Sequence, residues 1–238
     1  EEILLSESSS TIRKVTPCYN PTSLLRRKEG FVKGLAIEKL EKEWNKYPVI
    51  HLDLSSGKYY SLQNLHANLN LILLRQEEKY GLKTNAPTVY SARLRQILEA
   101  ARQQSGKQVV VLIDEYDAPM HDSVSAPELQ KSIRSIMRDL FSPLKEQERN
   151  LRFVLITGIS KFSQLSIFSE LNNLKNISMK DEYSAICGIT QQQLITDFRE
   201  GIEAMAAHNS LSFEETVEQL KEHYDGYHFT PNCPDIFN

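Results

Sequence analysis

The sequence predicts an α/β fold, in which a parallel β-sheet has helices on both faces and the C-terminal part of the chain is helical. Short apolar runs alternate with longer stretches whose apolar residues recur every three or four positions. The apolar runs are continuous, which is typical of strands that are buried on both faces. Alternation of strands and helices in this way implies parallel strands joined by right-handed crossovers.

The composition is that of a globular protein, and it argues against a membrane span, a disulfide framework and a general attraction to nucleic acid. The 238 residues are 40% hydrophobic and carry a net charge of -3, so nothing attracts the whole chain to a membrane surface or to nucleic acid. A basic cluster at Arg26, Arg27 and Lys28 leaves nucleic-acid binding open. No apolar run approaches the roughly 18 residues of a membrane span. Three widely spaced cysteines argue against a disulfide framework, and we expect a cytoplasmic protein.

The chain is expected to form one domain with a leader before it. Residues 1–28 are expected to be an altered or disordered leader, with at most a short strand at 11–15. Residues 29–180 form the expected α/β core. Residues 181–238 form the expected helical extension of the same domain, truncated at its end.

The elements of the core follow from periodicity and from breaking residues. A helix is expected from Phe31 to Trp44, and Pro48 ends it and opens a strand that runs to Ser55. The remaining expected elements are helices at 62–80, 88–104 and 128–146, strands at 109–113 and 151–157, and a mostly helical region at 160–223. Gly81 is expected to end the first of these helices, and Pro143 to bend or shorten the third.

Three expected strands end in polar residues. Asp53 follows the first, Asp114 and Glu115 follow the second, and residues 157–161 (Thr-Gly-Ile-Ser-Lys) follow the third. Because ligands bind at the carboxyl ends of parallel strands, we expect these side chains to share one edge of the sheet.

The segment VVVLIDEYDAPM, residues 109–120, has the form of a Walker B element. A buried strand presents Asp114 rigidly, and Mg²⁺ prefers carboxylate oxygen. Glu115 is placed to orient or deprotonate a water molecule that attacks a γ-phosphate. Two alternatives remain open. Asp114 and Glu115 could cap a following turn or helix, or the two residues with Asp117 could bind two metal ions in a nuclease, although no E-x-K motif lies nearby.

The end of the third strand supplies the other candidate groups. Thr157 and Ser160 are candidate nucleotide-binding residues, and Lys161 is a candidate catalytic residue beside the phosphate. The alternative for Lys161 is a solvated lysine at the start of a helix. A phosphate-binding loop of the form G-x-x-x-x-G-K-[ST] does not occur in the 238 residues.

Several motifs together resemble the AAA-ATPase-like family of bacterial proteins. They are IDEYDAP at 113–119, TGISKFSQLSIFSELNNLKNIS at 157–178 and YDGYHF at 224–229, together with the segment from Glu29 to Ser55. The resemblance covers about residues 30–238 and implies a P-loop NTPase-like fold that uses ATP and Mg²⁺. Asp114 would then hold the metal and Glu115 the attacking water.

The resemblance also implies partners. Family members often carry a nuclease-like domain related to restriction endonucleases, so a nuclease-like domain or partner protein is expected beside the nucleotide. Residues 21–25 (Pro-Thr-Ser-Leu-Leu) match the family's Gly-Lys-Ser segment only at Ser23 and the leucines. The main hypothesis is an ATP-binding and ATP-hydrolysing domain. The alternative is a catalytically inactive module of the same fold that binds or scaffolds a partner.

Overall fold

A computed structural model describes residues 2–6, 45–82, 89–159, 167–168, 174–178, 180–185, 188–224, 232–233 and 236–237. The chain divides into two compact units. The first contains the described residues up to Ile177, and the second contains those from Ser178 onward.

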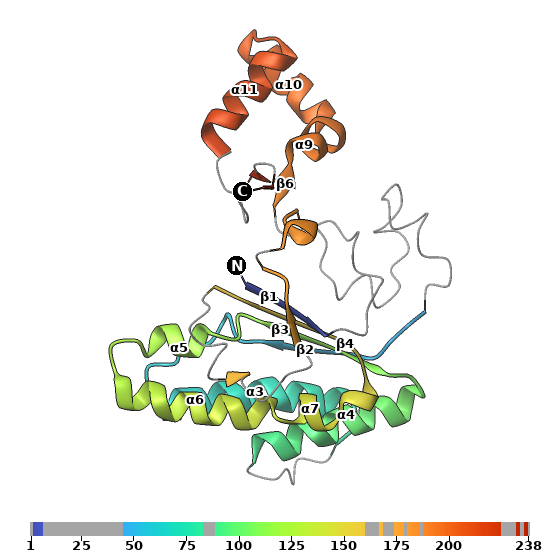
Figure 1. Cartoon of the computed structure of the whole chain (residues 1–238), viewed down its shortest axis with the longest axis vertical. Coiled ribbons are helices and arrows are strands. Elements are labelled where there is room, and N and C mark those ends of the chain that lie inside the picture. The colour runs from blue at the N-terminus through green and yellow to red at the C-terminus, as the bar shows by residue number, and fades with distance from the viewer. Residues whose placement is uncertain are drawn as a thin grey trace. The chain divides into compact units, whose positions relative to one another are not determined.

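The first unit is built on a five-stranded sheet with the order β2-β3-β4-β1-β5 (Figure 1). The strands are β2 (Val49–Asp53), β3 (Val109–Asp114), β4 (Leu151–Gly158), β1 (Glu2–Ser6) and β5 (Leu174–Asn176). β2, β3 and β4 are mutually parallel, whereas β1 runs antiparallel to both of its neighbours. The α/β prediction is therefore confirmed, and its parallel part has three strands.

β1 lies within the segment that the sequence predicts to be a leader. The backbone of Glu2 pairs with Gly158, and that of Leu5 pairs with Leu155. Because β1 is antiparallel to β4, its carboxyl end lies at the opposite edge of the sheet from the carboxyl ends of β2, β3 and β4. The short strand expected at 11–15 lies outside the described residues.

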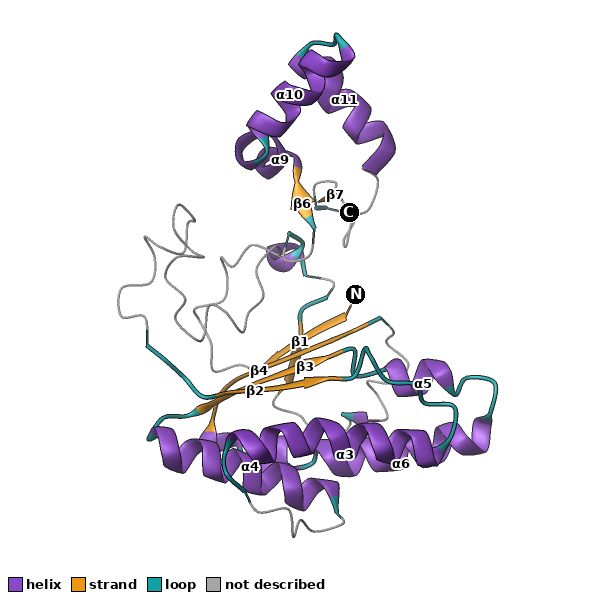
Figure 2. Ribbon diagram, turned by 180° about the vertical axis from the view of Figure 1, so that it is seen from behind, coloured by secondary structure: helices purple, strands orange, loops and turns teal. Residues whose placement is uncertain are grey.

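Described helices of the first unit pack against one face of the sheet (Figures 1 and 2). They are α3 (Leu62–Lys79), α4 (Tyr90–Ser105), α6 (Pro127–Phe141) and α7 (Pro143–Glu146). β2, β3 and β4 follow one another in the sheet in sequence order, so right-handed crossovers place both connections on the same face. The helix expected from Phe31 to Trp44 and the start of the region expected to be helical from Ser160 lie outside the described residues.

The core of this unit lies between the sheet and the helices. α3 buries Leu65, Leu69 and Leu73, which are spaced four residues apart and so share one helix face. The sheet contributes Val109 to Ile113, each no more than 5% exposed. The largest fully buried side chains are Tyr59, Tyr116, Phe141, Ile50, Leu52, Leu54, Leu65, Leu69, Leu73, Leu94, Ile97 and Leu98.

The ends of the helices have local causes. The Ser61 hydroxyl accepts a hydrogen bond from the Asn64 N–H at the start of α3. Gly106 ends α4 with φ at 66°, a conformation that costs a glycine little. Pro143 divides the expected helix at 128–146 into α6 and α7, with a break at Ser142, because proline lacks the N–H that would continue α6.

A short helix at the end of β3 was not predicted. The sequence pattern indicates a loop around Pro119, but α5 (Ala118–Asp122) forms there, followed by a turn to α6. The carbonyl of Asp117 accepts the Met120 and His121 N–H groups at 2.8 and 3.1 Å. Pro119 suits this first turn because its missing N–H has no partner to lose there.

The second unit contains a helical region and a small two-stranded sheet. Its elements are the 3₁₀ turn η4 (Asp181–Tyr183), β6 (Ile189–Thr190), α9 (Gln191–Asp197), α10 (Arg199–Asn209), α11 (Phe213–Tyr224) and β7 (Ile236–Phe237). β6 and β7 pair antiparallel. Ser210 turns α10 into α11 with φ at 56°, and Gly188 precedes β6 with φ at 103°.

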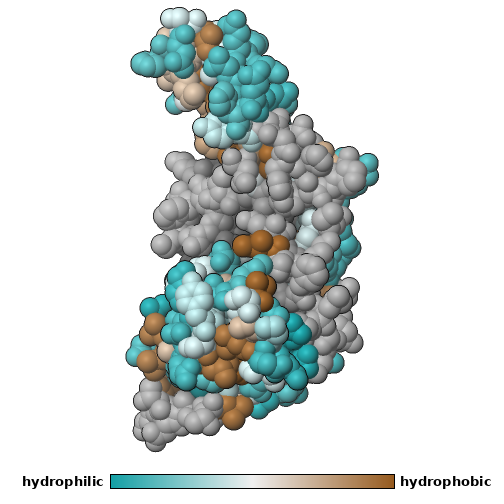
Figure 3. Space-filling model, turned by 90° about the vertical axis from the view of Figure 1, so that its left-hand side faces the viewer, coloured by the Kyte–Doolittle hydropathy of each residue, from teal (hydrophilic) through white to brown (hydrophobic). Residues whose placement is uncertain are grey.

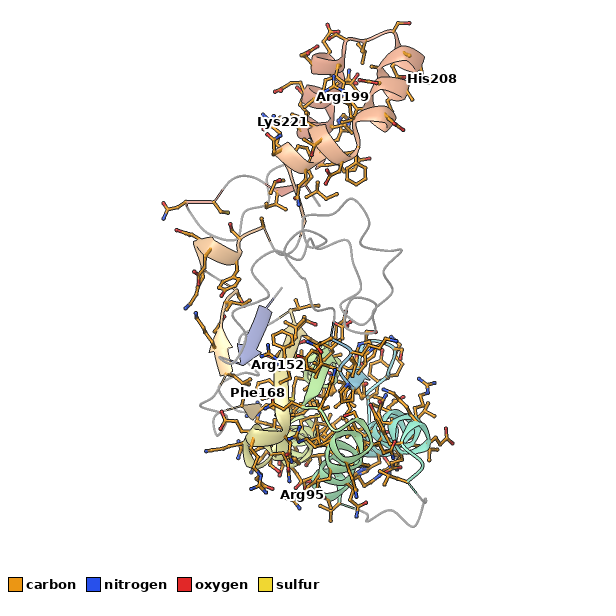
Figure 4. The ribbon with its side chains drawn as sticks, turned by 90° about the vertical axis from the view of Figure 1, so that its right-hand side faces the viewer. Arg95, Arg152, Phe168, Arg199, His208 and Lys221 are labelled. Atoms are coloured by element: carbon orange, nitrogen blue, oxygen red, sulfur yellow. The ribbon has the colours of Figure 1, made fainter. Side chains whose placement is uncertain are left out.

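The face of this unit that Figure 3 shows is largely hydrophilic over its described helices, with a smaller apolar area among them. The guanidinium of Arg199, labelled in Figure 4, lies 5.0 Å from the ring centre of Phe213, so it joins the start of α10 to the start of α11. None of the described helices is both long and apolar enough to cross a membrane.

Candidate functional site at the acidic strand end

The carboxyl ends of the three parallel strands meet at one edge of the sheet. Asp53, the last residue of β2, pairs in register with Asp114, the last residue of β3. Ile113 pairs with Ile156 of β4, two residues before β4 ends at Gly158. The predicted convergence of the three strand ends is therefore confirmed for the residues that the structure describes.

Asp114 and Thr157 lie in direct contact. The Thr157 hydroxyl donates a hydrogen bond to Asp114 Oδ1 across the β3–β4 pair. The Asp114 side chain is exposed, whereas the four residues before it in β3 are buried. A rigid, buried strand thus holds an accessible carboxylate at the ligand edge, with one oxygen oriented by a hydroxyl.

Glu115 has an unusual backbone conformation. Its φ is 47°, in the left-handed region that costs a residue with a side chain roughly 1–2 kcal/mol. The turn there lets the Tyr116 N–H donate to the Thr157 carbonyl at 3.1 Å. The residue that precedes helix α5 is Asp117, and the Glu115 carbonyl accepts the Ala118 N–H at 3.0 Å, which closes the turn before that helix.

Asp117 is a further functional candidate at this edge. The sequence places it only in the alternative two-metal site, and the structure buries it completely, at 0% exposed. Its Oδ2 accepts the Ile159 N–H at 2.9 Å and lies 2.9 Å from His121 Nε2. One sequence signal was available, since Asp just before Ala-Pro is a favoured position at a helix start, but it does not reveal the contact with β4.

The loop after β2 donates hydrogen bonds to two further carboxylates, those of Asp53 at the end of β2 and Asp122 at the end of α5. The Ser55 hydroxyl and N–H both donate to Asp53 Oδ1, at 2.6 and 2.9 Å. The hydroxyl is the main reason that the pKa of Asp53 lies below its usual value. The backbone N–H of Tyr59 donates to Asp122 Oδ2 at 2.9 Å, which ties this loop to the end of α5.

The pKa of Tyr59 reflects the negative charges of the same region. Its side chain is buried, and its hydroxyl donates to the Leu54 carbonyl at 2.9 Å. Burial raises the pKa of Tyr59 to about 12, and the negative charges of Asp53, Asp122 and Glu115 act in the same direction. The edge is therefore electronegative and favours a cation.

Among the described residues, no group of three or more His, Cys, Asp or Glu side chains is arranged to hold a metal ion. Mg²⁺ at a nucleotide site usually takes one or two carboxylates, and phosphate oxygens and water complete its shell. The exposed Asp114 carboxylate with the Thr157 hydroxyl fits that pattern and does not fit a metal cage built from protein alone. Ser160 and Lys161, the other two predicted site residues, lie outside the described residues.

Together, the sheet and the acidic strand end define an α/β protein of the P-loop NTPase-like class. A family model described as "Predicted AAA-ATPase" matches residues 16–168. The chain belongs to this AAA-ATPase-like family, as its motifs indicate.

A curated relative is known from Azotobacter chroococcum mcd 1, where it is described as an uncharacterized protein in the vnfD 5' region. The two chains are 31% identical over 202 residues, which is 85% of this chain and 37% of the relative. This chain therefore spans little more than a third of the relative's length. No solved structure matches the chain.

Proposed function

We propose that this chain is an ATP-binding and ATP-hydrolysing domain that works with Mg²⁺. The observation that carries the proposal is the end of β3, where the exposed Asp114 carboxylate is held by Thr157 and is followed directly by Glu115. Membership of the AAA-ATPase-like family supports it. The natural setting is the cytoplasm, with a nuclease-like domain or partner protein coupled to turnover.

Each residue has a distinct role in the proposed reaction. Asp114 binds the metal through water, and Thr157 orients its carboxylate. Glu115 positions and deprotonates the water that attacks the γ-phosphate. Ser160 contacts the nucleotide, and Lys161 balances the charge that develops on the transferred phosphoryl group. Bound Mg²⁺ would neutralise phosphate charge during the transfer.

Calorimetric titration with Mg-ATP tests binding directly, and phosphate release tests turnover. We expect Glu115→Gln to retain nucleotide but lose at least about 100-fold in kcat, because general-base catalysis contributes roughly 10²–10⁴-fold. Glu128→Gln, on the exposed first turn of α6, is the matched control and should leave kcat unchanged. Unchanged turnover in Glu115→Gln would reject its role, and the absence of Mg-ATP binding would reject the proposal.

A second candidate function is a catalytically inactive module of the same fold that binds or scaffolds a partner. Two observations favour it. The 238 residues contain no G-x-x-x-x-G-K-[ST] string. In addition, β1 runs antiparallel beside β4, so the chain leaves β1 at the edge opposite Asp114, whereas a phosphate-binding loop follows a strand at the ligand edge. The same two measurements separate the two functions, because an inactive module should show no heat of Mg-ATP binding and should release no phosphate.

A further inference from the structure

Buried Asp117 stands at the centre of the contacts that join the end of β3 to the end of β4. Its Oδ2 accepts the N–H of Ile159, the residue after β4, at 2.9 Å. The same oxygen lies 2.9 Å from His121 Nε2, one turn further along α5. A single carboxylate therefore links three segments, namely the end of β3, the start of α5 and the residue that follows β4.

Two further hydrogen bonds join the same two segments. The Thr157 hydroxyl donates to Asp114, and the Tyr116 N–H donates to the Thr157 carbonyl at 3.1 Å. Asp114 and Tyr116 thus bond to Thr157, and Asp117 bonds to Ile159, so the contacts follow the same order along both segments. This pairing continues the β3–β4 contact past the point where the strands end.

The packing around Asp117 leaves no room for the two segments to shift. A Cβ atom at Gly158 would lie 2.5 Å from the Tyr116 ring and 2.6 Å from Asp117 Oδ1. Tyr116 is 0% exposed, and its ring centre is 5.0 Å from that of Phe168. Glycine at 158 is therefore what allows the backbone of β4 to approach the turn after β3 this closely.

Burying a carboxylate in a turn costs free energy, because the charged group loses its contact with water. Removing an ionised group from water is unfavourable unless hydrogen bonds or an opposite charge compensate. Here the compensation comes from the backbone N–H of Ile159, just after β4, and from a histidine whose own side chain is 42% exposed. Hydrogen bonds to charged acceptors are about twice as strong as neutral ones, so this arrangement holds the Ile159 N–H more firmly than an uncharged side chain would.

We propose that Asp117 is a positioning residue, which fixes Ile159, the first residue after β4, relative to Asp114 and Glu115. This positioning role rests on the proposed function in one respect, namely that the groups positioned by Asp117 act on a nucleotide. Ile159 is followed in the sequence by Ser160 and Lys161, the residues expected at the phosphate. Asp117 itself contacts no substrate in this role and acts through the backbone of the β4 end.

The test uses Asp117→Ala and Asp117→Asn, with Asp122→Ala as the matched control. Asp122 also lies in α5 and also accepts a backbone N–H, but from Tyr59 after β2. Amide hydrogen exchange of Ile159 in the nucleotide-free chain is measured first. Asp117→Ala should speed this exchange about tenfold or more, and Asp117→Asn by less, because the amide keeps an acceptor without the charge. Asp122→Ala should leave it unchanged.

Steady-state kinetics give the second readout. Asp117→Ala should lower kcat by about 10–100-fold with KM for Mg-ATP within about threefold, because misplacement of a reacting group costs rate more than binding. Asp117→Asn should recover part of that loss, and Glu128→Gln, on the exposed first turn of α6, should match the wild type. If circular dichroism shows that Asp117→Ala does not fold, both the exchange and the kinetics are measured on Asp117→Asn.

The outcomes separate this inference from the proposed function. Unchanged Ile159 exchange in the folded Asp117 variants would overturn the positioning role, as would faster exchange with an unchanged kcat. If the wild type neither binds nor hydrolyses Mg-ATP, the proposed function fails, and the exchange comparison with Asp122→Ala alone decides whether Asp117 holds the end of β4.

Discussion

At the scale of single residues, the turn IDEYDAP divides its three carboxylates among three tasks. Asp114 is exposed at the ligand edge, Glu115 adopts a left-handed backbone, and Asp117 is buried in contact with β4. Acidic residues that are close in sequence repel one another in the same medium. Here the turn sends them into different surroundings, and each environment suits a different role.

Tyr59 offers a spectroscopic probe of this edge. Because its pKa is raised to about 12, the folded chain holds the phenol proton more tightly than the unfolded chain, whose tyrosines titrate near pH 10. The resulting stabilisation is complete below about pH 10 and is lost as the pH rises toward 12. Tyrosinate absorbance should show this as a wild-type minus Tyr59→Phe difference curve centred near pH 12. A difference curve centred at about pH 10, where tyrosines of the unfolded chain titrate, would contradict the burial of the Tyr59 phenol beside the carboxylates.

At the scale of elements, α3 and α4 are joined by a buried ion pair as well as by apolar contacts. Arg93 donates through Nε to Glu77 Oε1 at 2.7 Å and through Nη2 to Oε2 at 2.8 Å. The third guanidinium nitrogen donates to Asn70 Oδ1 at 2.5 Å. The two charged side chains are only 7% and 4% exposed, so removing one partner leaves the other charge in a poorly solvated place.

Glu77→Gln should therefore destabilise the first unit strongly. Breaking a buried pair by removing one partner costs about 3–5 kcal/mol, because the remaining charge is uncompensated. Glu203→Gln is the control, since Arg199 and Glu203 form an ion pair on α10 whose side chains are 60% and 54% exposed. Exposed pairs contribute roughly 0–1 kcal/mol. Urea unfolding measures both, and equal effects would contradict the assigned burial.

The elements also show where sequence patterns are sufficient. The three-and-four spacing of Leu62, Leu65, Leu69 and Leu73 predicts α3 with its first residue correct, because a helix face is a local property. Helix α5 was missed because one turn is too short to show a period. β5 and β6 were missed in the region expected to be helical, since strands of three and two residues depend on distant partners for their hydrogen bonds.

At the scale of the whole molecule, the candidate site is assembled from segments that lie far apart in the chain. β2, β3 and β4 bring Asp53, Asp114 and Thr157 to one edge although about fifty residues separate each from the next. Long crossovers through helices are the only way to place parallel strands side by side. The site's geometry therefore depends on the stability of the entire first unit.

Ligand binding should be visible as a change in the stability of the molecule. Mg-ATP at 100 times its Kd should stabilise the folded chain by about 2.7 kcal/mol, which corresponds to a rise in Tm of about 5–10 °C at this size. Differential scanning fluorimetry measures it, with ATP plus EDTA as the metal-free control. Asp114→Asn should lose most of the Mg²⁺-dependent rise, and an undiminished rise would contradict the role of Asp114 at the metal.

Local patterns alone were enough to predict α3, α4 and α6, the three parallel strands and the position of Asp114 at a strand end, because periodicity, prolines and glycines act within a few residues. Family motifs added the expectation of a nucleotide site. Pairings between distant segments were decided by the tertiary structure: Thr157 with Asp114, Asp117 with Ile159, Glu77 with Arg93, and β1 antiparallel beside β4. Each depends on burial and strand register, which no local spacing encodes.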